Sequence, residues 1–316
     1  MVDEEIQDYQ GARLAASEAI ILKKLEMQLG QPIPHPIQRE ENPYHEQWEP
    51  SKIEFGFNVE NFYVAGIALF FGDNPYFSEI LEITFTFPKL RSLILSANDL
   101  ENLPETIGQL QSLEYLELDF NCLQTLPDSI GQLHNLRILS VHSNNLQSLP
   151  NSIGQLHNLK RLYLNTNQLK SLPSDIGQLK SLEYLNLEEN QLNSVPESIG
   201  MLQNLQTLNL RYNRLKSIPN TVKQINDLNL YLEPNPFSLT GLLFLYDYTQ
   251  GNFKNMWPSK QKLEKHPLVQ PLDFNSLKLI NKALCPFCGV SGLVSGREKK
   301  TDLRKIFCSE CENIME

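Results

Sequence analysis

Several features that mark other protein classes are scarce in this chain of 316 residues. Its longest unbroken apolar run is eight residues, from Val64 to Phe71, whereas a membrane-spanning helix needs about 20. The first ten residues, MVDEEIQDYQ, are acidic where a secretory signal would be basic and then apolar. No N-x-S/T glycosylation acceptor occurs, although asparagine is abundant. We therefore expect a cytoplasmic protein with no membrane partner.

Basic residues are also fewer than acidic ones. The chain has 27 Lys and Arg against 37 Asp and Glu, a net charge of −10. Binding to a nucleic-acid backbone rewards clustered Lys and Arg, so an acidic chain is a poor match for that role. An apolar share of 41% and a charged share of 20% are typical of a folded, soluble chain. The length alone predicts about two domains.

A 23-residue repeat dominates the middle of the chain. The first unit, LRSLILSANDLENLPETIGQLQS, begins at Leu90, and five more begin at Leu113, Leu136, Leu159, Leu182 and Leu205. The segment DLNLYLEPNPF continues the pattern to residue 237, and VAGIALFFGDNP, residues 64–75, has apolar residues at the same offsets in a degenerate unit. Self-similarity at such a period indicates a solenoid, in which each unit buries its core against its neighbours.

Each unit has a physical interpretation. Its first eight residues alternate apolar and polar, which predicts a strand with one side turned inward. A buried amide at the ninth position can bond the backbone of adjoining turns. A proline then breaks the strand and starts a helical turn, and a glycine follows until Lys223 ends that series. The recurring residues are Asn98, Asn121, Asn144, Asn167, Asn190 and Asn213; Pro104, Pro127, Pro150, Pro173, Pro196 and Pro219; and Gly108, Gly131, Gly154, Gly177 and Gly200.

These motifs resemble the leucine-rich repeat superfamily. The form LPxxIGxLxxLxxLxLxxNxL is similar to its intracellular subfamily, which includes Ras-pathway scaffold proteins and many prokaryotic repeat proteins. The resemblance covers about 150 of the 316 residues. It implies an α/β fold, a curved solenoid with a parallel sheet on the concave side and short helical turns outside. Because members bind many different proteins, it implies a protein-interaction adaptor or scaffold whose partner is unidentified.

Strand positions 3, 5 and 7 of successive units point away from the core and line the concave sheet. Seven strands spaced about 4.8 Å apart make a surface roughly 30 Å long. Tyr and Arg mixed with acids is the composition of protein-recognition hot spots; the alternative is a solvated face chosen for β propensity. With position 8 added, the candidate protein-binding residues are Tyr115, Glu117, Asp119, Phe120, His142, Arg161, Tyr163, Tyr184, Glu188, Arg211 and Tyr212.

Catalytic motifs are missing from the sequence. It contains no GxxxxGK[ST] phosphate loop, no HExxH, no GxSxG and no Gly-rich dinucleotide fingerprint. His142 near Asp119 could act as a base and its orienting group, but neither has an evident nucleophile beside it. Cys122 follows a repeat asparagine and is best interpreted as a half-buried filler. We therefore expect no catalytic residues and no enzymatic activity.

The flanks divide the rest of the chain into segments. Residues 1–30 have helical apolar spacing that Gly30 would end, and residues 31–52 form a proline-rich connector. Residues 53–89 contain two strands around a turn at Glu60–Asn61, a capping hairpin and degenerate repeat before the leucine-rich repeats at 90–237. Residues 238–280 form a C-terminal cap and linker. The N-terminal helix caps the array or, alternatively, is a dimerising element.

Four of the five cysteines lie in the last segment, residues 281–316, as CPFC and CSEC. Two CxxC pairs separated by 19 residues can supply four thiolates in a tetrahedron, which suits one structural Zn²⁺. The alternatives are a rubredoxin-like iron site and redox or disulfide cysteines. The pattern resembles a zinc ribbon, and the expected metal ligands are Cys285, Cys288, Cys308 and Cys311. Thiolate ligands argue for a reducing compartment.

A basic cluster lies between the two cysteine pairs, at Arg297, Lys299, Lys300, Arg304 and Lys305. It supports the alternative function, a nucleic-acid-associated factor in which the zinc-ribbon-like module contacts RNA or DNA. Residues 281–316 carry nearly equal numbers of basic and acidic side chains, so a structural or protein-docking module is the preferred interpretation.

Overall fold

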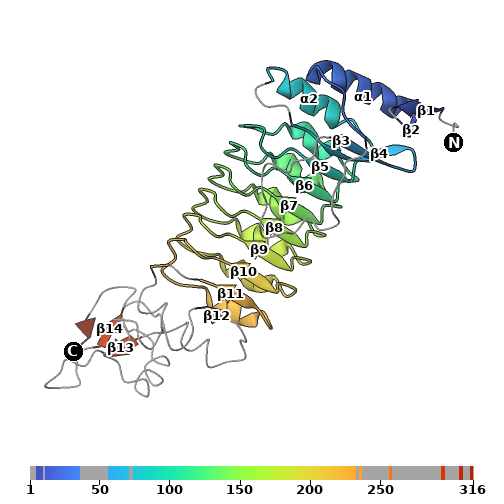
Figure 1. The fold of residues 1–316 in the computed structure, drawn as a ribbon. Coiled ribbons are helices and arrows are strands. Elements are labelled where there is room, and N and C mark those ends of the chain that lie inside the picture. The colour runs from blue at the N-terminus through green and yellow to red at the C-terminus, as the bar shows by residue number, and fades with distance from the viewer. Residues whose placement is uncertain are drawn as a thin grey trace.

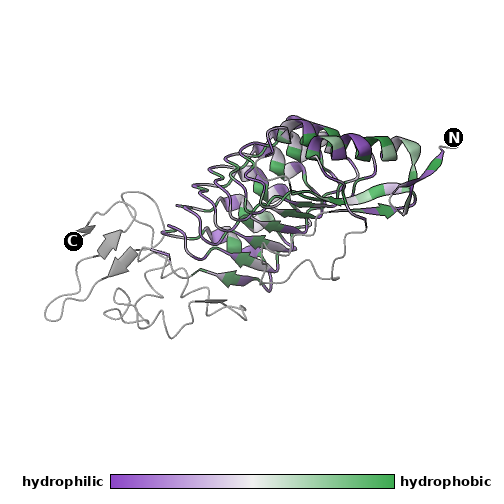
Figure 2. Cartoon of the chain, turned by 45° about the horizontal axis from the view of Figure 1, so that its top comes forward, coloured by the Kyte–Doolittle hydropathy of each residue, from purple (hydrophilic) through white to green (hydrophobic). Residues whose placement is uncertain are grey.

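The computed structural model describes residues 5–9, 11–35, 56–70, 74–232 and 235–236, together with four short strands nearer the C-terminus. Across the repeats the chain winds into an elongated solenoid, with the strands stacked side by side in one sheet (Figure 1). Hydrophobic positions recur in every coil, and the loops between them are mostly hydrophilic (Figure 2).

Each repeat contributes a three-residue strand and a five-residue 3₁₀ turn. The strands are β5 (Ser92–Ile94), β6 (Tyr115–Glu117), β7 (Ile138–Ser140), β8 (Arg161–Tyr163), β9 (Tyr184–Asn186), β10 (Thr207–Asn209) and β11 (Asn229–Tyr231). The turns are η2 (Glu105–Gln109), η3 (Asp128–Gln132), η4 (Asn151–Gln155), η5 (Ser174–Gln178), η6 (Glu197–Met201) and η7 (Asn220–Gln224). A proline in extended conformation precedes each turn, as at Pro150 before η4.

Adjacent strands pair in parallel, offset by one repeat. Leu116 lies opposite Leu93 and Leu139, and Leu162 lies opposite Leu139 and Leu185. These leucines are fully buried, so one side of the sheet faces the interior. Positions 3 and 5 of each unit therefore share the opposite face, in rows that run from repeat to repeat.

The repeat asparagines connect each unit to the one before it. Asn167 Oδ1 accepts the Leu146 N–H at 2.9 Å, and its Nδ2 donates to the Val141 carbonyl at 2.8 Å. The same two bonds to the preceding unit recur at Asn144, Asn190, Asn213 and Asn235. These buried amides satisfy backbone groups that the three-residue strands do not reach.

The glycine of each turn lies under the next turn. A Cβ added at Gly154 would lie 2.5 Å from the Asp175 carbonyl oxygen of the following repeat, and Gly131, Gly177 and Gly200 meet the next repeat in the same way. Within the described residues η7 is the last such turn, and there Lys223 replaces glycine. The glycine series is thus a packing requirement of the stack.

In the described residues before the repeats there are two hairpins and two helices. β1 (Ile6–Tyr9) and β2 (Ala12–Ala15) are antiparallel, and α1 (Ala16–Leu29) ends at Gly30 in a left-handed conformation. The helix predicted over residues 1–30 is therefore shorter in the structure, because Gly11 turns the chain and Ala12 and Leu14 are buried on a strand. An 8-residue helix, α2 (Phe77–Thr84), was not predicted.

The second hairpin closes one end of the sheet. β3 (Gly56–Glu60) pairs antiparallel with β4 (Tyr63–Ala68), and β4 pairs in parallel with β5, so the degenerate unit supplies a repeat strand. The turn lies at Asn61 and Phe62, which both have positive φ, one residue later than predicted. Buried Glu18 of α1 accepts the Val64 N–H at 2.7 Å, which ties the helix to this hairpin.

Nearer the C-terminus four strands are described by their backbone. β12 (Met256–Trp257) pairs in parallel with β11. β13 (Leu293–Ser295), β14 (Ile306–Cys308) and β15 (Ile314–Met315) form an antiparallel sheet in that order. Residues 36–52 of the predicted connector, and all of the predicted cap and linker at 238–280 except β12, lie outside the described residues. No helix in the described part of the chain is long and apolar enough to span a membrane.

Replacing Gly154 with Ala should destabilise the array by about 1–3 kcal/mol, because the added methyl overlaps backbone of the next repeat. Urea unfolding followed by circular dichroism measures the change. Gly66→Ala is the matched control, since its new Cβ would have ordinary contacts of 3.7 Å. Equal stability of the two variants would contradict the packing argument.

Asn167→Ala should also destabilise the array, by about 1–3 kcal/mol for each buried backbone group that loses its partner. The exposed Asn204 donates to the Lys180 carbonyl at the rim, so Asn204→Ala should change the free energy of unfolding by no more than about 0.5 kcal/mol. The same denaturation experiment compares the two. If Asn204→Ala lowered the free energy of unfolding as much as Asn167→Ala, burial would not be the reason that the asparagine bonds stabilise the array.

Candidate protein-binding face

The face of the sheet opposite the leucine core forms a groove of about 740 Å³ over β6–β11. We call it the concave groove. It is lined by positions 3, 5 and 7 of successive repeats: Tyr115, Glu117, Asp119, Ile138, Ser140, His142, Arg161, Tyr163, Asn165, Tyr184, Asn186, Glu188, Thr207, Asn209, Arg211 and Tyr231. The sequence analysis predicted this arrangement in rows, and the register of the strands produces it.

All of the predicted binding residues line this groove except Phe120 and Tyr212. Both of these occupy position 8, where the backbone has positive φ in every unit from Ala97 to Tyr212. They still contact residues of the groove. The Phe120 ring meets His142 edge-on with centroids 4.6 Å apart, and the Arg211 guanidinium lies 5.6 Å from the Tyr212 ring centroid.

The acids at the β6 end of the groove are buried, which does not fit the alternative of a solvated face at these two positions. Glu117 and Asp119 are each 4% exposed. Ser96 Oγ donates to Glu117 at 2.8 Å, and the Tyr115 hydroxyl also donates to it. Short serine side chains of neighbouring repeats allow this burial, because a buried carboxylate requires donors close to it. The two carboxylates are therefore hydrogen-bonded within the protein and hold the neighbouring side chains at this end of the groove.

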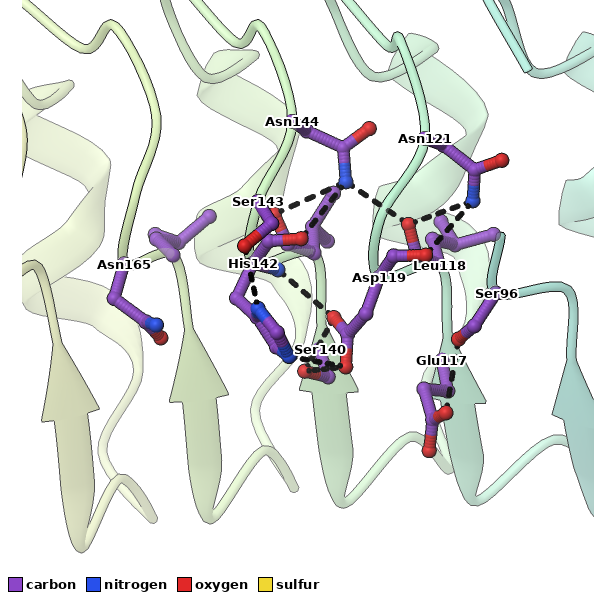
Figure 3. Close-up of polar contacts among 12 residues, drawn as sticks. Ser96, Glu117, Leu118, Asp119, Asn121, Ser140, His142, Ser143, Asn144 and Asn165 are labelled. Carbon is purple, nitrogen blue, oxygen red and sulfur yellow. Dashed lines mark hydrogen bonds and ion pairs between the residues drawn. The ribbon is translucent and has the colours of Figure 1, made fainter. Parts of the chain in front are cut away.

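Asp119 is the centre of a polar cluster (Figure 3). Its carboxylate accepts the Ser140 hydroxyl at 2.7 and 2.8 Å and the His142 backbone N–H at 2.8 Å. His142 Nε2 lies 3.1 Å from Asp119 Oδ2, and Nδ1 lies 3.0 Å from Ser143 Oγ. Since a carboxylate accepts, Nε2 is the nitrogen that carries a proton. Both ring nitrogens of His142 thus have a polar partner, and the side chain is fixed at the wall of the groove.

Hydroxyls lie beside His142 and Asp119, which the sequence analysis did not anticipate. Their setting differs from that of a hydrolytic nucleophile. Ser140 donates to the carboxylate, and Ser143 is not among the groove-lining residues. The N–H groups of Ser143 and Asn144 donate to carbonyls of the next repeat, so they are not available as oxyanion donors next to that hydroxyl. The polar groups of the cluster therefore hold the His142 side chain in place.

Aromatic and basic side chains dominate the other half of the groove. Tyr163 and Tyr184 stack with ring centroids 5.1 Å apart and planes inclined at 39°. Glu188 accepts the Asn209 amide at 2.8 Å and lies 3.8 Å from Arg211. Arg161 lies opposite Tyr184 in the strand register. All of these side chains are half-buried, so they offer more surface than the acids at the β6 end.

Tyr231 lines the end of the groove and is 38% exposed. The sequence analysis did not select it, because the seventh unit is partial. Position counting could have found it if the sixth unit is taken as one residue short: Asn229, Leu230 and Tyr231 align with Thr207, Leu208 and Asn209 of β10. The row of position 5 therefore extends one strand further than predicted.

The predicted metal ligands Cys285, Cys288 and Cys311 lie outside the described residues, and Cys308 is described only as the last residue of β14. Among the residues whose side chains are described, no group of three or more His, Cys, Asp or Glu is arranged to hold a metal ion. Cys122 is a free, half-buried thiol.

Comparison with known proteins concerns the repeats. Residues 79–171 and 174–235 match the leucine-rich repeat region family. A leucine-rich repeat protein of Leptospira interrogans is 35% identical over 56% of this chain and 51% of its own, with a TM-score of 0.44. The plant peptide hormone receptor RGFR1 in complex with RGF2 is 33% identical over 55% of this chain and 28% of its own, with a TM-score of 0.48.

The chain thus spans about half, and about a quarter, of the lengths of these two proteins. No curated protein matches it. The matched segments coincide with the stacked strands, turns and asparagine bridges described above. On this evidence the repeats of the chain are similar to leucine-rich repeat proteins and match that family over residues 79–171 and 174–235.

Proposed function

We propose that this protein is a cytoplasmic, non-enzymatic adaptor that binds a protein partner in the concave groove. The observation that carries the proposal is the stacked pair Tyr163–Tyr184 in a groove that Arg161 and Arg211 also line. Tyrosine and arginine present large surfaces that combine apolar contact with hydrogen bonding, and they are enriched where proteins bind one another. Binding of protein partners is also general among leucine-rich repeat proteins.

The two halves of the groove would contribute differently. Glu117 and Asp119 are buried and hydrogen-bonded within the protein, so they would shape the surface more than contact the partner. The half-buried residues of β8–β11 would form the centre of the interface, with Phe120 and Tyr212 at its rim. This division follows from burial, because binding energy comes from surface that is removed from water only on association.

We further propose that Cys285, Cys288, Cys308 and Cys311 bind one structural Zn²⁺. The antiparallel pairing of β13 with β14 supports this, because it sets Leu293, shortly after the first cysteine pair, opposite Cys308 of the second. A short hairpin of this kind buries too little surface to fold unaided, and a bound metal would supply the missing stability. Four thiolates would fill the coordination sphere of the ion and leave it no open position.

Replacing both Tyr163 and Tyr184 with Ala should weaken partner binding by at least about tenfold, since hot-spot aromatics contribute roughly 2 kcal/mol or more. The partner is first identified by capture from native lysate on the full chain, and its dissociation constant is then measured with purified proteins. Tyr76→Ala is the matched control, because Tyr76 is 54% exposed beside α2 and lies outside the groove. Unchanged affinity of the double variant would refute the groove as the binding site.

Purified full-length protein should contain one zinc per chain by elemental analysis. Cys285→Ser should lose it, because a three-thiolate site holds the ion less tightly. Cys122→Ser should retain it, since Cys122 belongs to the repeats. Substantially less than one zinc in the unaltered protein would dismiss the site.

A further inference from the structure

Two histidines occupy the same position in adjacent repeats. His134 and His157 are both residue 22 of their 23-residue unit, just before the strand, and both are exposed. Their backbones have the same hydrogen bond, from the residue's N–H to the carbonyl two residues earlier, at 2.8 Å. The Asn158 side chain also donates to the His134 carbonyl at 2.8 Å, so the two loops lie in direct contact. Neither histidine belongs to the concave groove.

The other repeats show where a side chain at this position extends. Gln111 Nε2 donates to the Gly108 carbonyl of its own turn at 2.5 Å and to the Gln132 carbonyl of the next repeat at 3.2 Å. Lys180 Nζ likewise donates to Gly177 at 2.8 Å and to Met201 of the next repeat at 3.3 Å. Side chains at position 22 therefore run along the solenoid towards the following repeat. An imidazole of His134 in the same direction would extend towards the repeat that contains His157.

We propose that His134 and His157 together bind one divalent first-row transition-metal ion, each through one ring nitrogen. Neighbouring strands of the stack lie about 4.8 Å apart, and the Asn158–His134 contact keeps the loops before them adjacent, a spacing from which two imidazoles can reach one ion. Imidazole suits Ni²⁺, Cu²⁺ and Zn²⁺, and exposure lets water complete the coordination. The rigid stack fixes both ligands in advance, so binding of the second nitrogen is intramolecular.

The charged side chains close to the two histidines in sequence permit a cation to bind between them. Arg137 and Lys160 stand at position 2, a few residues after each histidine, and both are engaged with acids. Arg137 lies 3.3 Å from Glu114, and Lys160 lies 3.2 Å from Glu183. These ion pairs offset the positive charge next to the histidines.

The test uses Ni²⁺ as the probe and the full chain, so that the C-terminal cysteines are the same in every sample. Equilibrium dialysis should show one more bound Ni²⁺ in the unaltered protein than in His134→Gln or His157→Gln. Affinity at this site should fall by roughly 100-fold or more when chelation is lost. Glutamine is the residue that this position has at Gln111 and Gln203, so both variants should fold, as circular dichroism would verify.

Lys180→Gln is the matched control, since it makes the same kind of change one repeat further on and should leave Ni²⁺ binding unaltered. Ni²⁺ should also raise the unfolding midpoint of the unaltered protein but not of either histidine variant, because the ion bridges two repeats only when they are folded. Equal Ni²⁺ binding by the unaltered protein and both folded histidine variants would overturn the proposal. So would an equal loss in Lys180→Gln.

Discussion

The bridge between each repeat asparagine and the preceding unit is the interaction on which the rest of the structure depends. One amide, as at Asn167, accepts a backbone N–H and donates to a backbone carbonyl of the previous coil. A three-residue strand is too short to fix its own register, and a ladder of buried amides repeated every 23 residues fixes it instead. Neighbouring coils are thereby locked one repeat apart, with their leucines aligned in the core.

That offset also produces the functional geometry. Because equivalent positions stack, each row on the surface contains the residues of one repeat position. A side chain therefore contacts the residue at the same position of the next repeat, or at a neighbouring position. Tyr163 at position 5 contacts Tyr184 at position 3 of the next repeat, and Asp119 holds His142 at the same position of the next repeat. The exposed histidines at position 22 lie in another such row, on a different side of the coil. The fold therefore fixes where rows occur, and the residue types decide what each row binds.

The period made much of this predictable. A fixed repeat determines the order of the strands, their parallel pairing and the set of residues that share the groove, and these agree with the structure. What the period does not contain is the interaction between particular residues. The burial of Glu117 depends on Ser96 and Tyr115, and the edge-on contact of the Phe120 ring depends on His142 in the next repeat. The hairpin before α1 and the helix α2 lie outside the repeats, where the secondary structure must be predicted from local apolar spacing alone. That spacing is ambiguous there, since Leu14 fits a helix or a strand equally well.

Burial divides the groove into a preorganised end and an adaptable end. At β6 and β7 the carboxylates are surrounded by hydroxyl and N–H donors of the protein itself, so their positions are set before any partner arrives. At β8–β11 the tyrosines and arginines keep part of their surface exposed and have several side-chain torsions to adjust. A rigid wall limits which shapes can enter, while the adaptable side chains supply contact area to those that do. If the groove binds a protein as proposed, selectivity and affinity would be carried by different strands, because a side chain already hydrogen-bonded within the protein gains little from a partner.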